Sequence, residues 1–549
     1  MLPPHSDVIL ITDRLVAPAY VGLKAYPAFI LLCEAPMAIS SEISSRVLNH
    51  KLDSKIMTAS EAAALIRNGD QIGMSGFTGS GYPKAVPIEL AHRIAEAHFR
   101  GQKFQVSVFT GASTGPELDG ALAMAGGIHL RLPYQSDPET RKRINAGEME
   151  YMDIHLSHVA QFVEYGFLGK LDVALIEVAA VLEDGRLVPS SSIGNNKTWI
   201  DQAERVILEV NSWQPMALEG MHDIYYGLEP PPNRKPIPLT KPGQRIGSPY
   251  LQVNPDKIVA IVLTDSPDRN SPFKAPDEAS KRIAGHILEF LSWEVKKGRM
   301  PANLLPLQSG VGNIANAVLF GLEEGPFEGL TSYTEVIQDG MIRLLKSGKL
   351  TSASATAFSL SPGMLDEVNA DMASYRERIV LRPQEISNNP GIIRRLGVIA
   401  MNGMIESDIY GNVNSTHVMG SRIQNGIGGS GDFARNGYLS IFMAPSIAQK
   451  GTISTIVPMA SHIDHTEHDV QVVVTEQGLA DLRGLSPRQR AHLIIEKCAN
   501  PDYKSLLKDY LDRAERLSYG KHTPHLLNEA LGWHNRYLRT GKMKPSEES

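Results

Sequence analysis

Short runs of apolar, β-branched residues recur along the chain, with amphipathic stretches between them. Such runs occur at 71–77, 106–109, 173–178, 205–210 and 258–262. Strands that are buried on both faces read in this way, whereas strands with one face in water alternate apolar and polar positions. The pattern therefore predicts an α/β fold built on buried, mainly parallel sheets.

Helix signals occur between these runs. Thr58-Ala59-Ser60-Glu61 has the spacing of a capping box, in which the first and last side chains satisfy the free N–H groups of a helix start, and Gly69 ends this helix. A long amphipathic pattern predicts a helix over 277–297. Near the end of the chain, helices are predicted at 486–498 and 502–517.

One unit of strand, glycine turn and helix occurs twice. The run 71–77 is followed by Thr78-Gly79-Ser80-Gly81 and a helix from about Val86, while Gln308-Ser309 is followed by Gly310-Val311-Gly312 and a second apolar helix. The two units match in pattern, not in residue identity. We therefore expect two related open α/β domains.

The domain division follows from these elements. We expect a loose extension over 1–44, a first α/β domain over 45–268, a second over 269–525 and a tail over 526–549. Residues 15–37 are apolar, but Lys24, Glu34 and three prolines interrupt them, so they do not form a membrane span. The proline-rich stretch 229–238 is predicted to be a surface excursion.

Composition narrows the function. The chain has 549 residues, 42% of them hydrophobic, with a net charge of −6, which fits a globular protein and lacks the basic footprint of a nucleic-acid binder. The two cysteines, Cys33 and Cys498, lie far apart, which argues against a disulfide framework or a Cys-rich zinc site. This usage indicates a reducing compartment, the cytoplasm or the mitochondrial matrix.

Glu335 is the most informative candidate residue. It follows the Gly310-Val311-Gly312 turn by one helix and one connection, so a carboxylate at a strand end lies beside a backbone that can receive an anion or an oxyanion. Taken alone, the turn is more often plain helix packing and a lone Glu is more often a surface carboxylate. The suggested chemistry is acyl transfer through a glutamyl intermediate.

Further motifs downstream favour the functional interpretation of Glu335 and the glycine turn. They are Leu381-Arg382-Pro383-Gln384-Glu385-Ile386-Ser387-Asn388-Asn389-Pro390-Gly391, Met401-Asn402-Gly403-Met404, Gly426-Ile427-Gly428-Gly429-Ser430-Gly431-Asp432-Phe433 and Val474-Thr475-Glu476-Gln477-Gly478. With the Glu335 region, they resemble the acetyl-CoA hydrolase/transferase family of class I CoA-transferases. The resemblance covers about 45–545.

The resemblance implies a mechanism. Glu335 would attack an acyl-CoA thioester and become a glutamyl-CoA thioester. Asn388 would donate its side-chain amide close to the glutamate, and the backbone at Val311 and Gly429 would form a second donor set. Arg269 would hold the carboxylate substrate or the glutamate. Without the resemblance, Asn388 reads as a cap before Pro390, and Arg269 reads equally well as part of an interdomain salt bridge.

The same resemblance implies where coenzyme A binds. The predicted contacts are Gly310, Val311, Gly312, Asn313, Ile314, Asn425, Gly429 and Lys450. CoA and acyl-CoA would be substrates, with no permanently bound cofactor. The loop 76–84 would face the site and shape the acyl pocket. We expect a cytoplasmic homodimer that moves CoA between succinyl-CoA and acetate, without nucleic-acid or membrane partners.

Other functions stay open at this point. Water could attack the same thioester, which would make the chain a hydrolase, and propionyl- or hydroxybutyryl-CoA could be the acyl donor. A dinucleotide sensor is disfavoured because position 315, where a third glycine would stand, is Ala. His462, His465 and His468 could in principle hold zinc. Strand-like flanks would turn His462 and His465 to opposite faces, so we expect no metal.

Overall fold

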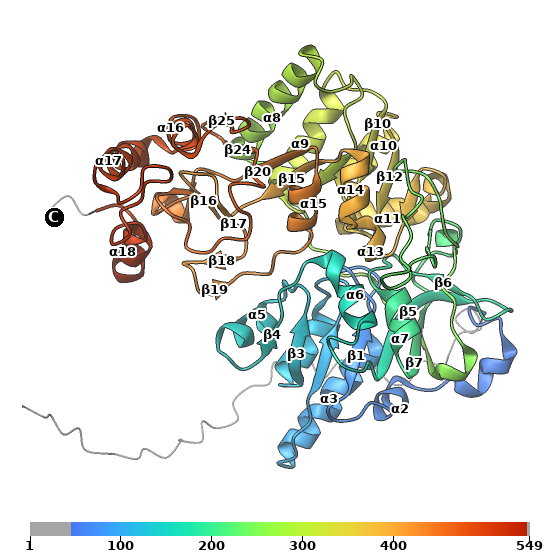
Figure 1. The fold of residues 1–549 in the computed structure, drawn as a ribbon. Coiled ribbons are helices and arrows are strands. Elements are labelled where there is room, and N and C mark those ends of the chain that lie inside the picture. Colours follow the sequence, from blue (N-terminus) through green and yellow to red (C-terminus); the bar gives the residue numbers. More distant parts are fainter. Residues whose placement is uncertain (1–44, 546–549) are drawn as a thin grey trace, which may run out of the picture. The chain divides into compact units, whose positions relative to one another are not determined.

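The computed structural model describes residues 45–545, so the predicted extension over 1–44 lies outside the described residues. Two eight-stranded sheets dominate the fold (Figure 1). The first has the strand order β4-β3-β2-β1-β5-β7-β8, with β6 beside β5. Its strands are β1 (Gln71–Met74), β2 (Val106–Phe109), β3 (Ile128–Leu132), β4 (Glu150–Tyr151), β5 (Val173–Val181), β6 (Leu187–Pro189), β7 (Arg205–Asn211) and β8 (Ile258–Thr264).

The second sheet has the order β14-β12-β10-β9-β15-β20-β24-β25. Its strands are β9 (Leu307–Ser309), β10 (Leu330–Tyr333), β12 (Leu350–Ala355), β14 (Ile379–Leu381), β15 (Ile399–Gly403), β20 (Leu439–Met443), β24 (Val472–Thr475) and β25 (Gly478–Asp481). Short pairings outside this sheet involve β11 (Val336–Ile337), β13 (Ala357–Phe358), β16 (Glu406–Asp408), β17 (Val413–Asn414), β18 (His417–Val418), β19 (Arg422–Ile423), β21 (Ile447–Ala448), β22 (Ile453–Ser454) and β23 (Ile456–Val457).

The two sheets share one topology. In each, the strand that comes first in the chain lies centrally: β1 pairs in parallel with β2 and β5, and β9 pairs in parallel with β10 and β15. The next strands extend the sheet on one side and the later strands extend it on the other. This shared order confirms the prediction of two related α/β halves.

Helices cover the sheets. In the first half they are α2 (Ala59–Ala64), α3 (Ala85–Phe99), α4 (Ala121–Met124), α5 (Pro138–Asn145), α6 (Val159–Glu164) and α7 (Asn196–Gln202). In the second they are α8 (Glu278–Lys296), α9 (Asn313–Glu324), α10 (Asp339–Lys346), α11 (Pro362–Ala370), α12 (Met372–Tyr375), α13 (Gln384–Ser387), α14 (Pro390–Leu396), α15 (Ser430–Asn436), α16 (Pro487–Cys498), α17 (Pro501–Leu517) and α18 (Gly532–Thr540). Within 45–545, none of these is long and apolar enough to cross a bilayer.

Helix starts follow the signals in the sequence. The Thr58–Glu61 capping box is present at α2. Asp277 caps α8 by accepting from the Ser280 N–H. Ser486 forms a capping box at α16. Because these caps satisfy orphan N–H groups locally, they could be recognised without knowledge of the tertiary structure.

The segment after β7 departs from its prediction. Residues 229–236 lie at the surface, but Ile237 and Leu239 are buried in a cluster with Ile392 and Ile393 of α14. Arg395 donates to the carbonyls of Ile237 and Leu239, at 2.6 and 2.9 Å. The prediction of a surface excursion is therefore correct only for residues 229–236, because the residues from Ile237 on pack against the other half of the molecule.

The chain end also departs from expectation. We expected a tail over 526–549, but this region contains α18, and Trp533, His534 and Met543 are buried. His534 Nε2 lies 2.7 Å from Glu406 Oε2. Aromatic and apolar residues in a mainly polar sequence gave too weak a periodic signal, and the packing surface that orders them comes from distant residues.

Candidate active site

Glu335 lies at the carboxyl end of β10, between β10 and β11. The Thr356 N–H donates to its carbonyl at 2.8 Å, and the preceding Thr334 N–H donates to Ser354 at 2.9 Å. The Gly310-Val311-Gly312 turn follows the neighbouring parallel strand β9. Since parallel strands end at the same edge of a sheet, the glycine turn and the glutamate share that edge, as the sequence predicted.

Two donors face the Glu335 carboxylate. Asn388 Nδ2 lies 3.3 Å from Glu335 Oε1. A Cβ placed on Gly429 would overlap both Glu335 Oε1 and Asn388 Nδ2, so only glycine allows this close approach. Burial raises the pKa of Glu335 to about 7, although Asn388 and the Gly429 backbone lower it. The carboxylate is thus held in a poorly solvated position with neutral donors only.

Asn388 is oriented by its own neighbours. Ser387 Oγ donates to Asn388 Oδ1 at 2.9 Å, which leaves the Nδ2 group to face Glu335. The capping role expected at this point falls to Asn389, whose Oδ1 accepts from Gly391 and Ile392 at the start of α14. The side chain of Asn388 is therefore free to act as an amide donor to the carboxylate.

Asp432 on α15 is a second carboxylate at the site. It lies 3.5 Å from Asn388 Nδ2, and its other contacts include the Ser157 hydroxyl at 2.6 Å, the Ser157 N–H at 3.0 Å and His155 Nδ1 at 4.0 Å. Burial raises its pKa to about 7, and Glu335 adds to this shift. Among residues 45–545, no Lys or Arg forms an ion pair with Glu335 or Asp432, so no such cation offsets the effect of Glu335 on the pKa of Asp432.

Glu335 and Gly429 line a cavity of about 530 Å³. Both halves contribute to its wall. The first half supplies residues that include Phe77, Thr78, Gly79, Tyr134 and Leu156, and the second half supplies residues that include Arg269, Asn270, Val311, Asn402, Met404, Asn425 and Ser430. The loop after β1 therefore faces the site, as predicted for its first residues.

Arg269 lies at the cavity but does not bond to Glu335. Its Nε pairs with Glu117 Oε1 at 3.0 Å, and the side chain is 55% exposed. Glu117 belongs to the predicted first domain and Arg269 is the first residue of the predicted second domain, so the structure contains the interdomain salt bridge that was the alternative for Arg269. The guanidinium keeps free N–H groups at the solvent side of the cavity, where an incoming carboxylate could meet them.

The other predicted contacts divide into two groups. Val311, Asn425 and Gly429 line the cavity, and Asn425 Nδ2 donates to Tyr134 OH at 2.7 Å across the two halves. A second group lies outside the lining: Gly310, Gly312, Asn313, Ile314 and Lys450. The Gly310 N–H is already bonded to the Met401 carbonyl at 2.9 Å, so Gly310 shapes the turn instead of donating to a ligand.

The sequence matches one family along most of its length. Residues 40–263 match the acetyl-CoA hydrolase/transferase N-terminal domain, and residues 367–511 match the C-terminal domain of the same family. A succinyl-CoA:acetate CoA-transferase of Clostridium kluyveri is 53% identical over 91% of this chain and 92% of its own. The chain belongs to the acetyl-CoA hydrolase/transferase family.

Other relatives span both activities. A propanoyl-CoA:succinate CoA transferase of Escherichia coli is 47% identical, covering 89% of this chain and 98% of its own. An acetyl-CoA hydrolase of Schizosaccharomyces pombe is 45% identical, covering 92% and 99%. Members of the acetyl-CoA hydrolase/transferase family with these names therefore resemble the chain almost equally over nearly full length.

Solved structures agree on the fold. RipA from Yersinia pestis superposes with a TM-score of 0.65 at 22% identity, covering 85% of this chain and 98% of its own. A 4-hydroxybutyrate CoA-transferase from Porphyromonas gingivalis gives a TM-score of 0.57 at 22% identity, covering 84% and 98%. The two open α/β halves thus have the class I CoA-transferase fold.

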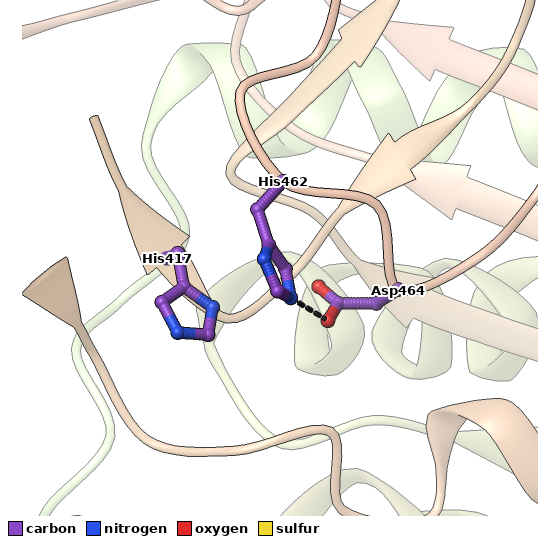
Figure 2. Close-up of side chains that lie close together, drawn as sticks. All are labelled: His417, His462 and Asp464. Carbon is purple, nitrogen blue, oxygen red and sulfur yellow. Dashed lines mark ion pairs between the residues drawn. The ribbon is translucent and has the colours of Figure 1, made fainter. Parts of the chain in front are cut away.

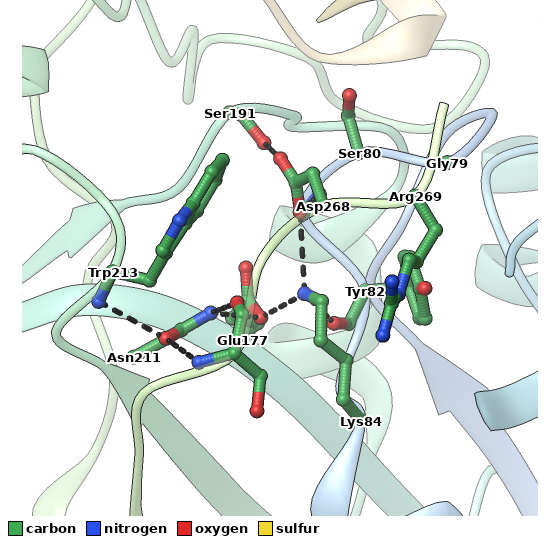
Figure 3. A network of polar contacts seen from close by, with 12 residues as sticks. Gly79, Ser80, Tyr82, Lys84, Glu177, Ser191, Asn211, Trp213, Asp268 and Arg269 are labelled. Carbon is green, nitrogen blue, oxygen red and sulfur yellow. Dashed lines mark hydrogen bonds and ion pairs between the residues drawn. The ribbon is translucent and has the colours of Figure 1, made fainter. Parts of the chain in front are cut away.

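A buried polar network supports the first-half wall of this family member's cavity (Figure 3). Lys84, which we expected in a loop facing the site, instead reaches inward to Glu177 Oε2 at 2.6 Å and Asp268 Oδ1 at 3.2 Å. Asp268 directly precedes Arg269 and also accepts from the Gly81 N–H at 3.1 Å. These contacts therefore connect the segment that carries Arg269 to the glycine loop after β1.

Sequence reasoning did not assign roles to Asp432, Ser157 and Tyr134. Asp432 stands inside the glycine-rich motif 426–433, so its place in the motif was visible, but its contact with Asn388 depends on how α15 packs beside α13. Ser157 and Tyr134 come from the other half of the chain, and no local pattern marks them. These residues could be found only once the two halves were placed together.

Proposed function

We propose that the chain is a CoA-transferase that moves CoA between succinyl-CoA and acetate through a glutamyl-CoA thioester on Glu335. The observation that carries this proposal is the half-buried Glu335 carboxylate, which faces a cavity with Asn388 and Gly429 as neutral donors and no cationic partner within the described chain. The similarity to the Clostridium kluyveri transferase supports the choice of substrates.

The reaction needs only carboxylates and a thiolate. A Glu335 oxygen attacks the thioester carbonyl, and the tetrahedral adduct collapses by breaking the C–S bond, which releases the CoA thiolate and leaves a mixed anhydride of Glu335 and succinate. The thiolate then attacks the Glu335 carbonyl, which releases succinate and forms the glutamyl-CoA thioester. Acetate attacks this thioester, and the same two steps run in reverse to give acetyl-CoA and the free carboxylate. No water or external redox partner is consumed.

The geometry suits each developing charge. Each attack places negative charge on a carbonyl oxygen, so donors aimed at that oxygen lower the barrier. Asn388 offers its amide on the Glu335 side, and the Val311 backbone at the cavity wall offers an N–H toward the acyl-CoA carbonyl. The raised pKa of Glu335 reflects weak solvation, which makes the carboxylate a stronger nucleophile than one in water.

CoA and acyl-CoA are substrates in this scheme, and no permanently bound cofactor is required. We place the thioester end of CoA beside Glu335 and its nucleotide end toward Asn425 and Lys450. Lys450 lies outside the cavity and is exposed, so it would meet only a distant part of a long ligand. A homodimeric state and a cytoplasmic location stay predictions, testable by light scattering and fractionation.

Hydrolysis is the second candidate, because the Schizosaccharomyces pombe relative is named an acetyl-CoA hydrolase. Water would replace acetate in the attack on the same thioester. Arg269 is 55% exposed at the cavity wall, so solvent reaches the position from which either acceptor would approach. The two activities then differ in how well the loaded site excludes water.

The test is single-turnover loading with succinyl-CoA, followed by an acetate chase. We expect the mass of the chain to rise by one bound CoA at Glu335, and acetate to discharge it far faster than buffer does. Glu385→Gln is a matched control, because Glu385 is also a buried carboxylate with its pKa raised to about 7 but does not line the cavity. It should load like the parent chain. Equal discharge with and without acetate would establish the hydrolase, and loading of a Glu335→Gln variant would overturn the mechanism.

A further inference from the structure

Three potential metal ligands meet behind the cavity wall (Figure 2). His417 belongs to β18, while His462 and Asp464 lie in the connection between β23 and β24. One ligand atom of each residue lies within 4.8 Å of the others, and all three residues are half-buried. His462 Nε2 is 3.1 Å from Asp464 Oδ1, and the two imidazole rings lie 3.9 Å apart, tilted by 39°.

The neighbours of this trio set the ligand atoms. Thr416 Oγ1 lies 2.8 and 2.9 Å from the two Asp464 oxygens, to which its hydroxyl can donate. It lies 2.6 Å from His417 Nδ1, from which it can then accept. This chain of bonds places the proton of His417 on Nδ1 and leaves a lone pair on Nε2. Metal-bound histidines are commonly oriented by such a partner on the second ring nitrogen.

Charge also favours a cation at this point. Asp464 supplies the negative charge. Its side chain is only 5% exposed, and it is held by the Ser415 N–H at 2.6 Å, so one ligand of the three is already fixed by the fold.

The sequence had grouped different histidines. His465 is buried against Phe442, and its Nε2 contacts Ser430 Oγ at 3.1 Å, so it is not available to the cluster. His468 is exposed on the same loop and is not one of the three. The third ligand comes instead from His417 on β18.

We propose that His417, His462 and Asp464 form a binding site for a divalent transition-metal ion of the zinc type. Two imidazoles and one carboxylate are a donor set that suits Zn²⁺, whereas Mg²⁺ and Ca²⁺ prefer oxygen ligands throughout. The three residues leave a fourth position for water. Since Asp464 also bonds to Ser415, a cavity-lining residue, the ion would lie one residue behind the wall of the active site.

The experiment is Zn²⁺ titration of the intact chain by calorimetry in a buffer that does not chelate, with Co²⁺ absorption as a report on geometry. We expect one ion per chain and a Co²⁺ spectrum of four-coordinate type. His417→Ala and His462→Ala should each weaken binding by about 100-fold or more, and Thr416→Val by about 10-fold, as loss of an outer partner does. His468→Ala is the matched control and should bind as the parent chain does.

Two results would overturn the site. One is unchanged affinity in both His417→Ala and His462→Ala with circular dichroism that matches the parent chain. The other is equal loss in His468→Ala, which would indicate scattered surface binding. If an alanine variant misfolds, His417→Gln replaces it, because glutamine keeps the hydrogen-bonding shape without a nitrogen ligand. Because ion binding is measured directly, its outcome does not depend on whether the chain transfers CoA.

Discussion

Each half of the molecule contains a poorly solvated glutamate close to an aspartate, but the two pairs have different neighbours. In the first half, Glu177 and Asp268 share the Lys84 ammonium, which lies 2.6 and 3.2 Å away. In the second half, Glu335 and Asp432 share only the Asn388 amide, at 3.3 and 3.5 Å. Burial raises the pKa of both glutamates to about 7.

The difference between the two pairs lies in compensation. Burial alone would lower the pKa of Lys84, but Glu177 and Asp268 raise it above its ordinary value, so the ammonium stays charged. A matched cation makes the first group part of the architecture. The second group faces a cavity with neutral donors, so its carboxylate is left available for reaction. Burial is therefore matched by a cation in the first group and left unmatched beside the cavity in the second.

The sharpest way to break this comparison is to remove the reactive carboxylate. We expect Glu335→Ala to lower transfer by at least about 10⁴-fold, because the covalent step has no other nucleophile. The circular dichroism spectrum and the melting temperature should stay at or above those of the parent chain, since a poorly compensated buried charge is lost. An active Glu335→Ala enzyme would remove the basis of the mechanism.

Removing the cation from the first group should instead lower the stability of the protein. Lys84→Met leaves Glu177 and Asp268 without their partner, and we expect a loss of about 3–5 kcal/mol in the free energy of unfolding. Denaturant titration measures this loss. Lys281→Met removes a surface pair to Glu278 and serves as the control, with no measurable change expected. Equal stability of the two variants would mean that Lys84 does not hold the network.

The amide between the two second-half carboxylates should matter for rate. We expect Asn388→Ala to lower kcat by about 10²–10³, as loss of one oxyanion donor does, with little change in KM. Loss of the donor should also raise the apparent pKa of the kcat profile, because Asn388 lowers the pKa of Glu335. A change confined to KM would assign Asn388 to substrate binding.

Arg269 tests whether the cavity wall contributes a cation to acceptor choice. If its guanidinium grips the incoming carboxylate, Arg269→Met should slow the acetate half-reaction about tenfold more than acyl-CoA loading, and the loaded thioester should leak to water. Single-turnover loading and chase measure the two steps separately. An equal loss in both would make Arg269 a structural partner of Glu117.

The smallest expected effect is on pH-dependent stability. The folded chain holds the Glu335 proton more tightly than the unfolded chain between about pH 4.5 and 7, so the stability contributed by Glu335 falls as the pH rises through that window. Glu335→Gln should therefore match the parent chain near pH 5 and exceed it by about 1 kcal/mol near pH 8. Melting temperatures at one scan rate check the sign, and a gap that shrinks with pH would contradict it.

Local signals in the sequence predicted much of the fold. The runs at 106–109 and 205–210 became β2 and β7, and the capping box at Thr58 starts α2. Glu335 and Gly429 were found together because each stands in a long contiguous motif, and the structure brings them into contact. Patterns of this kind are written within a few residues, so they survive without tertiary information.

The predictions that failed concern residues whose partners lie far away in the sequence. Lys84 reads as a loop residue, and its two carboxylates stand 93 and 184 positions away along the chain. His417 lies on β18, whereas His462 lies in the connection between β23 and β24, so a search for closely spaced histidines misses His417. Such contacts are set by how elements pack, and no local periodicity encodes them.

The packing of Ile237 and Leu239 against α14 has a consequence for protein synthesis. These residues leave the ribosome before Ile392 and Arg395, which cover them, and at 5–20 residues per second the delay is roughly 10–30 s. During that time the nascent first half carries two bare apolar side chains and uncovered carbonyls. The first half has then been fully synthesised but cannot yet bury these side chains. We expect chaperones to bind the nascent chain in this state.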